Sequence, residues 1–222
     1  MKRLLILCSP IMLIVLSLAT IVSCQQNPAP TPAPAPALTP APVTVPAIPT
    51  NFTTYTSEGF FSISYPQGWA PAISVMEEME KEAKAWIKSI DPEVDIEDAK
   101  MIFIGGRPNE EGWYPSVSIV IMPRTTGYYT LDEICEAEDL WAREYSQKYR
   151  VYSQIRTMVD GREADITCDE DYEPETGLWS YTSLTTVKDD FVWFVVCGSE
   201  SEDYNEYEDI FNNIVRSLRI LN

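Results

Sequence analysis

The sequence predicts an α+β fold in which a central antiparallel sheet is sandwiched by helices. Short segments of alternating apolar and polar residues, each ended by a turn, make up most of residues 51–222 and indicate strands. Three longer segments change to a helical period. Because the turns between the later strands are short, those strands are expected to be antiparallel.

The first half of this region is expected to contain four strands and one helix. Residues 60–65 alternate in polarity and stop at a Pro-Gln-Gly turn, and residues 70–76 are expected to form the neighbouring strand. Residues 77–90 have apolar side chains on one helical face and acidic residues in the first turn, where the helix dipole favours them. Residues 100–105 and 116–122 are predicted as two further strands.

The second half is expected to hold a helix, four strands and a last helix. The helix at 131–149 begins after Thr130, which forms a predicted capping box with Glu133. Residues 191–196 are continuously apolar, which indicates a central strand covered on both faces. The remaining elements are predicted strands at 151–159, 163–168 and 178–187 and a predicted helix at 202–218.

Two segments of this region resemble a known family. Residues 60–69, F-F-S-I-S-Y-P-Q-G-W, resemble the F-x-I-x-Y-P-x-G-W opening of PsbP-like domains, and residues 211–218 resemble their final helix. The resemblance covers most of residues 52–220 and implies the Mog1/PsbP fold with secreted or lumenal placement. In photosynthetic members it also implies an extrinsic role at photosystem II. That role does not transfer to this chain, because the sequence contains no histidine for any His-based metal contact.

The N-terminal residues have the layout of a bacterial lipoprotein signal. Lys2 and Arg3 precede a mostly apolar stretch, which ends at Ile21-Val22-Ser23-Cys24. This motif resembles a lipobox, so residues 1–23 are predicted to be a signal peptide and Cys24 the site of lipid attachment. The alternative is an uncleaved membrane anchor, since residues 4–22 are just long enough to span.

Residues 24–50 contain the lipid-attachment Cys24 and a Pro/Ala-rich linker, and residues 51–222 form the predicted PsbP-like α+β domain. Proline lacks a backbone N–H and holds φ near one value, so the linker cannot join a helix or a sheet. We expect a semi-rigid spacer of up to about 80 Å at roughly 3.1 Å per residue. A Pro-rich ligand for an SH3-like partner is the alternative.

Composition excludes several functions. The formal net charge is −18, and removal of Lys2 and Arg3 with the leader leaves 16 − 2 = 14 bases against 34 acids, a net of −20. Such a charge repels a phosphate backbone, so no nucleic-acid partner is expected. The absence of histidine excludes Ser-His-Asp and Cys-His catalysis and His-ligated metal sites.

An acidic segment at 169–177 is a weak candidate calcium site, because its carboxylates recur at alternate positions. It does not match an EF-hand loop, which needs glycine where Pro174 stands. The alternative is a solvated acidic hairpin turn. The candidate calcium ligands are Asp169, Asp171, Glu173 and Glu175.

Two aromatic segments are weak candidate partner surfaces. Residues 105–114 are expected to be a flexible loop carrying Arg107, Trp113 and Tyr114, and Tyr128 and Tyr129 lie in a second segment. Loops on a rigid scaffold often carry binding residues. The alternative is that these rings cover the sheet edge.

Three cysteines remain in the domain once Cys24 is lipidated. Cys168 and Cys197 lie on strands with one strand between them, which puts them about 9.6 Å apart, too far for a disulfide. Cys135 could reach Cys197, and buried free thiols are the alternative. No C-x-x-C pair supports redox catalysis.

Together these features predict a membrane-anchored, extracytoplasmic and non-enzymatic lipoprotein. Its domain is expected to bind a protein partner or to scaffold a membrane complex, with no cofactor other than calcium. The alternatives are a calcium or small-ligand binding module, and an enzyme of unrecognised type.

Overall fold

The protein is described by a computed structural model that covers residues 48–221, except 91–95, 110–111, 125–129, 146–147 and 174–176. The predicted signal peptide, Cys24 and nearly all of the linker lie outside these residues. Within the described part, no helix combines the length and the apolar character that a membrane crossing requires.

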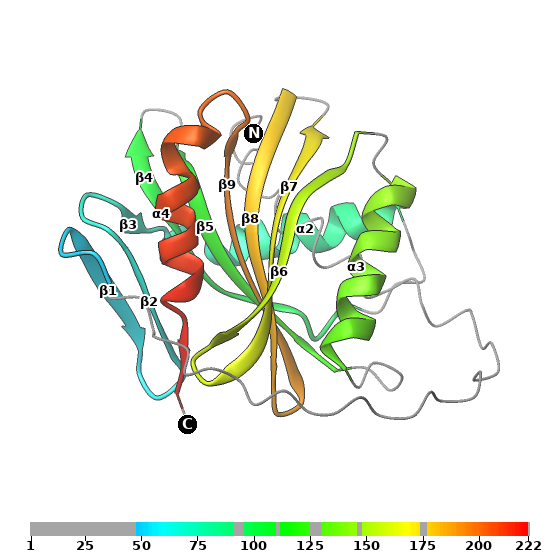
Figure 1. Cartoon of the computed structure of the whole chain (residues 1–222), viewed down its shortest axis with the longest axis horizontal. Helices are drawn as coiled ribbons and strands as arrows, with labels where there is room; N and C mark the ends of the chain where they lie inside the picture. The colour runs from blue at the N-terminus through cyan, green and yellow to red at the C-terminus, as the bar shows by residue number, and fades with distance from the viewer. Residues whose placement is uncertain are drawn as a thin grey trace.

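The elements follow one another in the order shown in Figure 1. They are β1 (Phe52–Ser57), β2 (Phe61–Pro66), β3 (Ala70–Pro71), the 3₁₀ turn η2 (Ile73–Val75), α2 (Met76–Ile90), β4 (Lys100–Asn109), β5 (Gly112–Pro123), α3 (Leu131–Tyr145), β6 (Arg150–Val159), β7 (Arg162–Glu173), β8 (Gly177–Lys188), β9 (Phe191–Glu200), α4 (Tyr204–Arg216) and β10 (Arg219–Ile220).

A seven-stranded sheet forms the centre of the molecule. Its strand order is β3-β4-β5-β9-β8-β7-β6, and every neighbouring pair is antiparallel. Strands β1, β2 and β10 form a separate three-stranded sheet. The predicted α+β class with a large antiparallel sheet is therefore confirmed.

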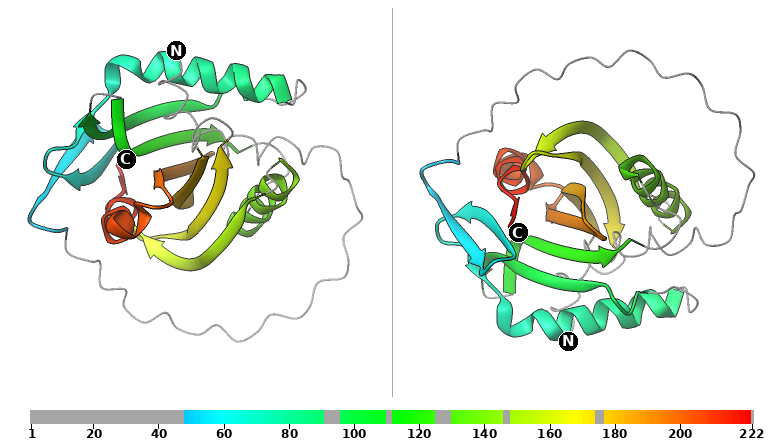
Figure 2. Two further views of the ribbon diagram at one scale, coloured as in Figure 1. Left: turned by 90° about the horizontal axis from the view of Figure 1, so that it is seen from above. Right: turned by 90° about the horizontal axis from the view of Figure 1, so that it is seen from below.

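Strand β9 holds the fourth of the seven positions and supplies side chains to two hydrophobic clusters. Val192, Phe194 and Val196 belong to a cluster that includes residues of α2 and α3. Trp193 and Val195 belong to a second cluster that includes residues of α4 and β2. Figure 2 shows α4 on one side of the curved sheet and α2 and α3 on the other. The prediction that this strand is buried on both faces is confirmed.

The start of α3 is stabilised by a capping box. Glu133 N donates to Thr130 Oγ1 over 3.2 Å, and Thr130 N donates to Glu133 Oε2 over 2.9 Å. These two bonds satisfy backbone N–H groups that a helix N-terminus otherwise leaves without partners. The helix then buries Ile134, Ala137 and Ala142 against the sheet. The predicted cap is therefore present.

The two segments that carry the family resemblance lie together. Phe61 and Ile63 of β2 pack in one cluster with Phe211 and Ile214 of α4. At the end of α4, Ser217 Oγ accepts a 2.8 Å hydrogen bond from Ser64 N. This buried contact joins positions 153 residues apart and fixes the last helix to the opening strand.

The β6–β7 hairpin closes through the predicted Asp160-Gly161 turn. Val159 pairs with Arg162, so the loop has two residues, and both have positive φ, 53° and 73°. Positive φ at both central positions is the geometry of a type I′ turn, whose twist suits antiparallel strands.

Several elements differ from the sequence-based expectation. The predicted strand at 70–76 is wrong: only Ala70–Pro71 is extended, it pairs with β4, and Ile73–Val75 is a 3₁₀ turn before α2. Pro71 lacks the N–H that a longer ladder would need. Strands β1 and β10 were not predicted, although the Thr- and Tyr-rich segment Phe52–Ser57 has high strand propensity. Helix α3 ends at Tyr145 rather than at residue 149.

Candidate functional site

A pocket lies between α3 and strands β6 to β9 and continues into an open groove; together we call them the α3 crevice. The enclosed part has a volume of about 50 Å³, and the open groove about 420 Å³. Cys135 and Gln154 line both parts. The enclosed part is lined by Cys135, Glu138, Asp139, Ala142, Tyr149, Val151, Gln154, Thr167, Asp169, Tyr181, Ser183 and Val196.

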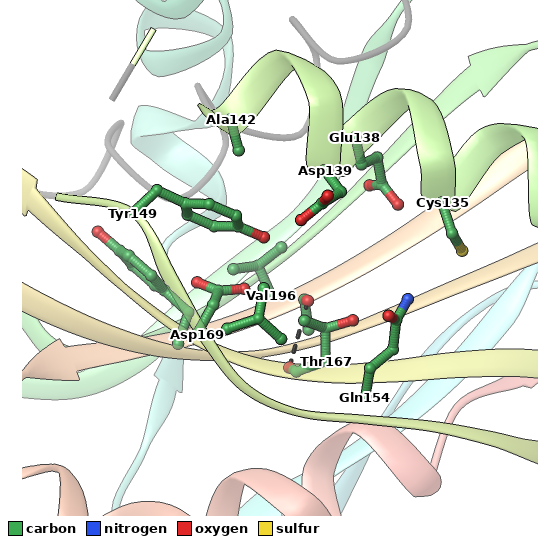
Figure 3. A pocket seen from close by; sticks show the side chains of 12 residues that line it. Cys135, Glu138, Asp139, Ala142, Tyr149, Gln154, Thr167, Asp169 and Val196 are labelled. Carbon is green, nitrogen blue, oxygen red and sulfur yellow. Dashed lines mark hydrogen bonds between the residues drawn. The ribbon is translucent and has the colours of Figure 1, made fainter. Parts of the chain in front are cut away.

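Local periodicity explains why these side chains face one another. Cys135, Glu138, Asp139 and Ala142 are spaced i, i+3, i+4 and i+7, which places them on one face of α3. On β7 the alternate residues Thr167 and Asp169 share a face, and they pair with Ser183 and Tyr181 of β8. Figure 3 shows the carboxyl groups of Asp139 and Asp169 and the Tyr149 hydroxyl directed into the same space.

Two carboxyl groups of the crevice have strongly raised pKa values. Burial raises the pKa of Glu138 to about 8; a hydrogen bond from Thr185 opposes this, and the charges of nearby acids add to it. Thr185 Oγ1 donates to Glu138 Oε2 over 3.2 Å. Burial, and then the charge of Asp171, raises the pKa of Asp169 to about 8. Each residue keeps part of its surface exposed, while protein atoms surround its carboxyl group.

The carboxyl group of Asp169 differs from its neighbours in its partners. Asp139 forms an ion pair with Arg143, whose Nε lies 2.8 Å from Asp139 Oδ2. Within the described ranges, no hydrogen bond or ion pair reaches the Asp169 carboxyl. No Lys or Arg is among the described residues that line the enclosed pocket. Among the residues that the structure describes, Asp169 is therefore an enclosed acid without a counter-cation.

The remaining polar lining groups are neutral donors. Burial, followed by the charges of Asp169 and other acids, raises the pKa of Tyr149. Burial, followed by the charge of Glu138, raises the pKa of the Cys135 thiol. Both groups therefore stay protonated near neutral pH, and Cys135 is not a thiolate nucleophile.

In the open groove, acidic side chains have a basic partner. Arg156 contacts Asp132, and its Nε lies 3.5 Å from Oδ2 of the buried Asp165. Asp165 also accepts a 3.1 Å hydrogen bond from Thr167 Oγ1. Arg156 therefore pairs with the acids of the groove, and no described contact joins it to Glu138 or Asp169.

The candidate calcium ligands do not form a turn. Strand β7 continues to Glu173, because Asp171 and Tyr172 pair with residues of β8, so Asp169 and Asp171 lie in the strand on one face. The turn expected at 169–177 is therefore wrong for residues 169–173, which belong to β7, and for Gly177, which begins β8; residues 174–176 lie outside the described residues. Glu173 ends β7, nothing is described of its side chain, and Glu175 lies outside the described residues. Among the described side chains, no group of three or more metal-ligating residues is arranged to hold an ion.

The candidate aromatic surface is not a flexible loop. Residues 105–109 and 112–114 belong to β4 and β5, and Arg107 is exposed on β4. The half-buried Tyr114 donates to Asp203 Oδ2 over 2.7 Å and accepts from Glu200 N over 3.1 Å. Trp113 lies on β5, with no description of its side chain. Tyr128 and Tyr129 fall outside the described residues. A binding role for these residues stays a prediction.

All three domain cysteines are buried free thiols. Cys168 and Cys197 both pair with Thr182 of β8, so one strand separates them as predicted. Cys135 lines the α3 crevice, whereas Cys197 belongs to the cluster that contains α4. These two thiols therefore lie on opposite sides of the sheet, and the pairing considered for them is not formed.

Sequence reasoning missed Glu138, Asp139 and Tyr149. The available signal was the spacing of Glu138 and Asp139 on the same helix face as Cys135 and Ala142. An acid on an inward face is costly unless it is neutralised or bound, so this spacing was informative.

Comparison with known proteins adds remote likenesses only. No protein-family model and no curated protein matches the sequence. The fold is similar to that of cyanobacterial PsbP from Synechocystis, with 10% identity, a TM-score of 0.47, and coverage of 77% of this chain and 92% of that one. It is also similar to PA94 of Pseudomonas aeruginosa, a protein of unknown function (10% identity, TM-score 0.46, 76% and 96% coverage). A third likeness is to LpqN of Mycobacterium tuberculosis, which is involved in cell envelope biogenesis (11% identity, TM-score 0.40, 57% and 80% coverage). PsbP-like proteins are thus among the solved structures that this chain resembles.

Proposed function

We propose that this chain is a lipid-anchored extracytoplasmic binding protein. In this proposal a PsbP-like domain, with its sheet sandwiched between helical layers, binds a protein partner or scaffolds a membrane complex through the α3 crevice. The observation that carries the proposal is the Asp169 carboxyl, which is enclosed, directed into the crevice and without a counter-cation in the described part of the chain. A buried carboxyl group can ionise at low cost only when a partner supplies the opposite charge, and otherwise it stays protonated.

Binding suits the crevice better than catalysis. The enclosed space of about 50 Å³ is far smaller than the roughly 300–1,000 Å³ of pockets that enclose small molecules. The Cys135 thiol is held protonated, and the sequence has no histidine to act as a base. The groups present can therefore hold a charged or hydrogen-bonding group, and we assign the domain no enzymatic role.

Calcium is the second candidate ligand, because Asp169 and Asp171 lie on the same face of β7. Calcium takes six to eight oxygen ligands, so water or a partner would supply most of them. Titration of the protein with Ca²⁺ tests this candidate, and absence of heat at millimolar Ca²⁺ would exclude it.

The predicted anchor gives the proposal its geometry. A lipid on Cys24 and a spacer of up to about 80 Å would hold the domain away from the membrane, within reach of other membrane proteins. Mass spectrometry of the mature protein is expected to find a diacylglyceryl modification on Cys24 and no residues 1–23. An intact Met1 or an unmodified Cys24 would contradict the anchor.

The partner is tested by crosslinking and affinity capture of the full-length protein from its native membranes. The test variant Asp169→Asn replaces the ionisable carboxyl group of the crevice by a neutral amide, and the control Asp98→Asn makes the same substitution at an exposed turn. We expect a reproducible crosslinked partner with the wild type and the control, and a large loss with Asp169→Asn. Equal capture by both variants would exclude the crevice. Absence of any partner for the wild type would contradict the binding role.

A further inference from the structure

The enclosed pocket of the α3 crevice has room for the end of a ligand rather than for a whole ligand. A site for one ordered water needs about 10–15 Å³, so about 50 Å³ admits a group of a few atoms. The adjoining groove of about 420 Å³ is open and shares Cys135 and Gln154 with the pocket. A ligand would therefore place a small end in the pocket and extend along the groove.

The acidic side chains of the pocket indicate which chemical group of a ligand would bind there. Its described lining carries the carboxyl groups of Glu138, Asp139 and Asp169 and no basic side chain. Of these, Asp139 has Arg143, and Glu138 has only the hydroxyl of Thr185. Asp169 has no positive partner among the described residues, so a cation in this space would supply one. Charge-assisted hydrogen bonds of this kind are stronger than neutral ones.

The walls of the pocket select the shape of the group that carries the cation. Ala142, Val151 and Val196 contribute apolar side chains to the lining, and Tyr181 also lines the pocket. Methylene groups pack against such surface while a terminal charge reaches polar partners. A slim unbranched stem with a terminal cation matches both the apolar walls and the acidic end.

We propose that the α3 crevice binds an alkylammonium group, such as the end of a lysine side chain, and exchanges a carboxyl proton for the cation. This inference rests on the proposed binding function and names its ligand chemistry. The ammonium lies between Asp169 and Glu138, and the stem leaves through the groove between α3 and β6. One proton departs to solvent as one cation enters, so the charge of the enclosed site changes little.

The proton exchange follows from the groups around Asp169 and Glu138. Burial raises the pKa values of both carboxyl groups to about 8, so both groups are mostly protonated at neutral pH. A nearby ammonium favours the ionised form and lowers these pKa values. The other titratable groups facing them are Cys135, Asp139 and Arg143 of α3, Tyr149, Arg156 of β6, and Asp165 and Asp171 of β7.

The inference is tested by calorimetric titration of the full-length protein in detergent micelles with n-butylamine, and with n-butanol as the neutral probe of the same shape. We expect butylamine to bind and butanol not to bind. Affinity should rise by up to about tenfold per pH unit from pH 6 to 7, the limit for one displaced proton, and should level off above pH 8. Buffers of different ionisation enthalpy should report about one proton released.

Variants distinguish binding of butylamine in the crevice from nonspecific attraction of a cation to an acidic protein. Asp169→Asn should weaken butylamine binding at least tenfold and remove the proton release, whereas Asp98→Asn should change neither. Glu138→Gln is a second test variant that does not depend on the behaviour of Asp169→Asn. Equal binding of butylamine and butanol, or unchanged binding in both crevice variants, would overturn the inference.

Two further arms distinguish the source of the amine. The first probe is Nα-acetyl-lysine N-methylamide, which keeps the ε-ammonium group. If it binds more tightly than butylamine, the source of the amine is a protein side chain that extends along the groove. Equal binding of the two probes would indicate a free amine. The inference also fails separately from the proposed function. Partner capture that depends on Asp169 without butylamine binding would overturn only the ligand chemistry, and butylamine binding without any partner would overturn only the protein-binding role.

Discussion

Replacement of Asp169 by asparagine should stabilise the protein, and more so as the pH rises. The ordinary pKa of this carboxyl group is 3.8, and burial raises it to about 8 in the folded state. Between these values the folded protein holds a proton that the unfolded chain has lost. When the folded state binds more protons than the unfolded state, the free energy of unfolding falls as the pH rises. Asparagine has the same shape and no charge, so it removes this dependence.

The size of the effect follows from the two pKa values. At about 1.36 kcal/mol per pH unit, the interval from 3.8 to about 8 corresponds to at most about 5 to 6 kcal/mol. Water penetration and relaxation reduce such penalties in real proteins, so we expect roughly 2 to 4 kcal/mol at pH 8 to 9. Between pH 5 and 7 the difference in unfolding free energy between variant and wild type should grow by up to about 1.4 kcal/mol per pH unit.

Urea unfolding of wild type, Asp169→Asn and the control Asp98→Asn, repeated from pH 4 to 9, measures this difference directly. The control should follow the wild type, because Asp98 is exposed. A difference for Asp169→Asn that does not change with pH, or a variant less stable than the wild type at pH 8, would refute the reasoning that the Asp169 carboxyl is enclosed and uncompensated.

Three further substitutions test the fold. Thr130→Ala removes the capping box of α3 and should lower the free energy of unfolding by about 1 kcal/mol, whereas Thr53→Ala at an exposed position of β1 serves as a comparison; an unchanged urea midpoint would show that the cap is unimportant. Phe211→Ala removes a fully buried side chain of α4 and should lower the free energy of unfolding by about 3 to 5 kcal/mol. This loss should appear as a large fall in the thermal midpoint, and a loss below about 1 kcal/mol would contradict the burial of Phe211. Tyr114→Phe removes the hydroxyl between Asp203 and the Glu200 N–H and should cost about 1 to 3 kcal/mol, with chemical denaturation as the measurement; a neutral effect would indicate that water replaces the hydroxyl.

Local sequence patterns predicted most elements of this fold. The capping residues Thr130 and Glu133, the Asp160-Gly161 turn and the apolar run of β9 act through their own backbone or their immediate neighbours. Such signals can be read without knowledge of the rest of the chain. Strand ends were less predictable: β7 and β8 extend through the acidic segment because cross-strand pairs such as Asp171 with Trp179 continue the ladder. A single strand does not show what its partner will supply.

The candidate site shows the same division. The sequence by itself determined a strongly acidic chain without histidine, an N-terminal lipobox pattern and an acidic segment that contains Asp169. Only the tertiary structure decided that Asp169 faces Glu138 and Tyr149 across a crevice while Arg156 is engaged with Asp132 and Asp165. The pKa of a carboxyl group depends on its solvation and on the charges around it. Those depend on contacts between α3 and β7, which are distant in sequence, and the composition of the chain does not contain them.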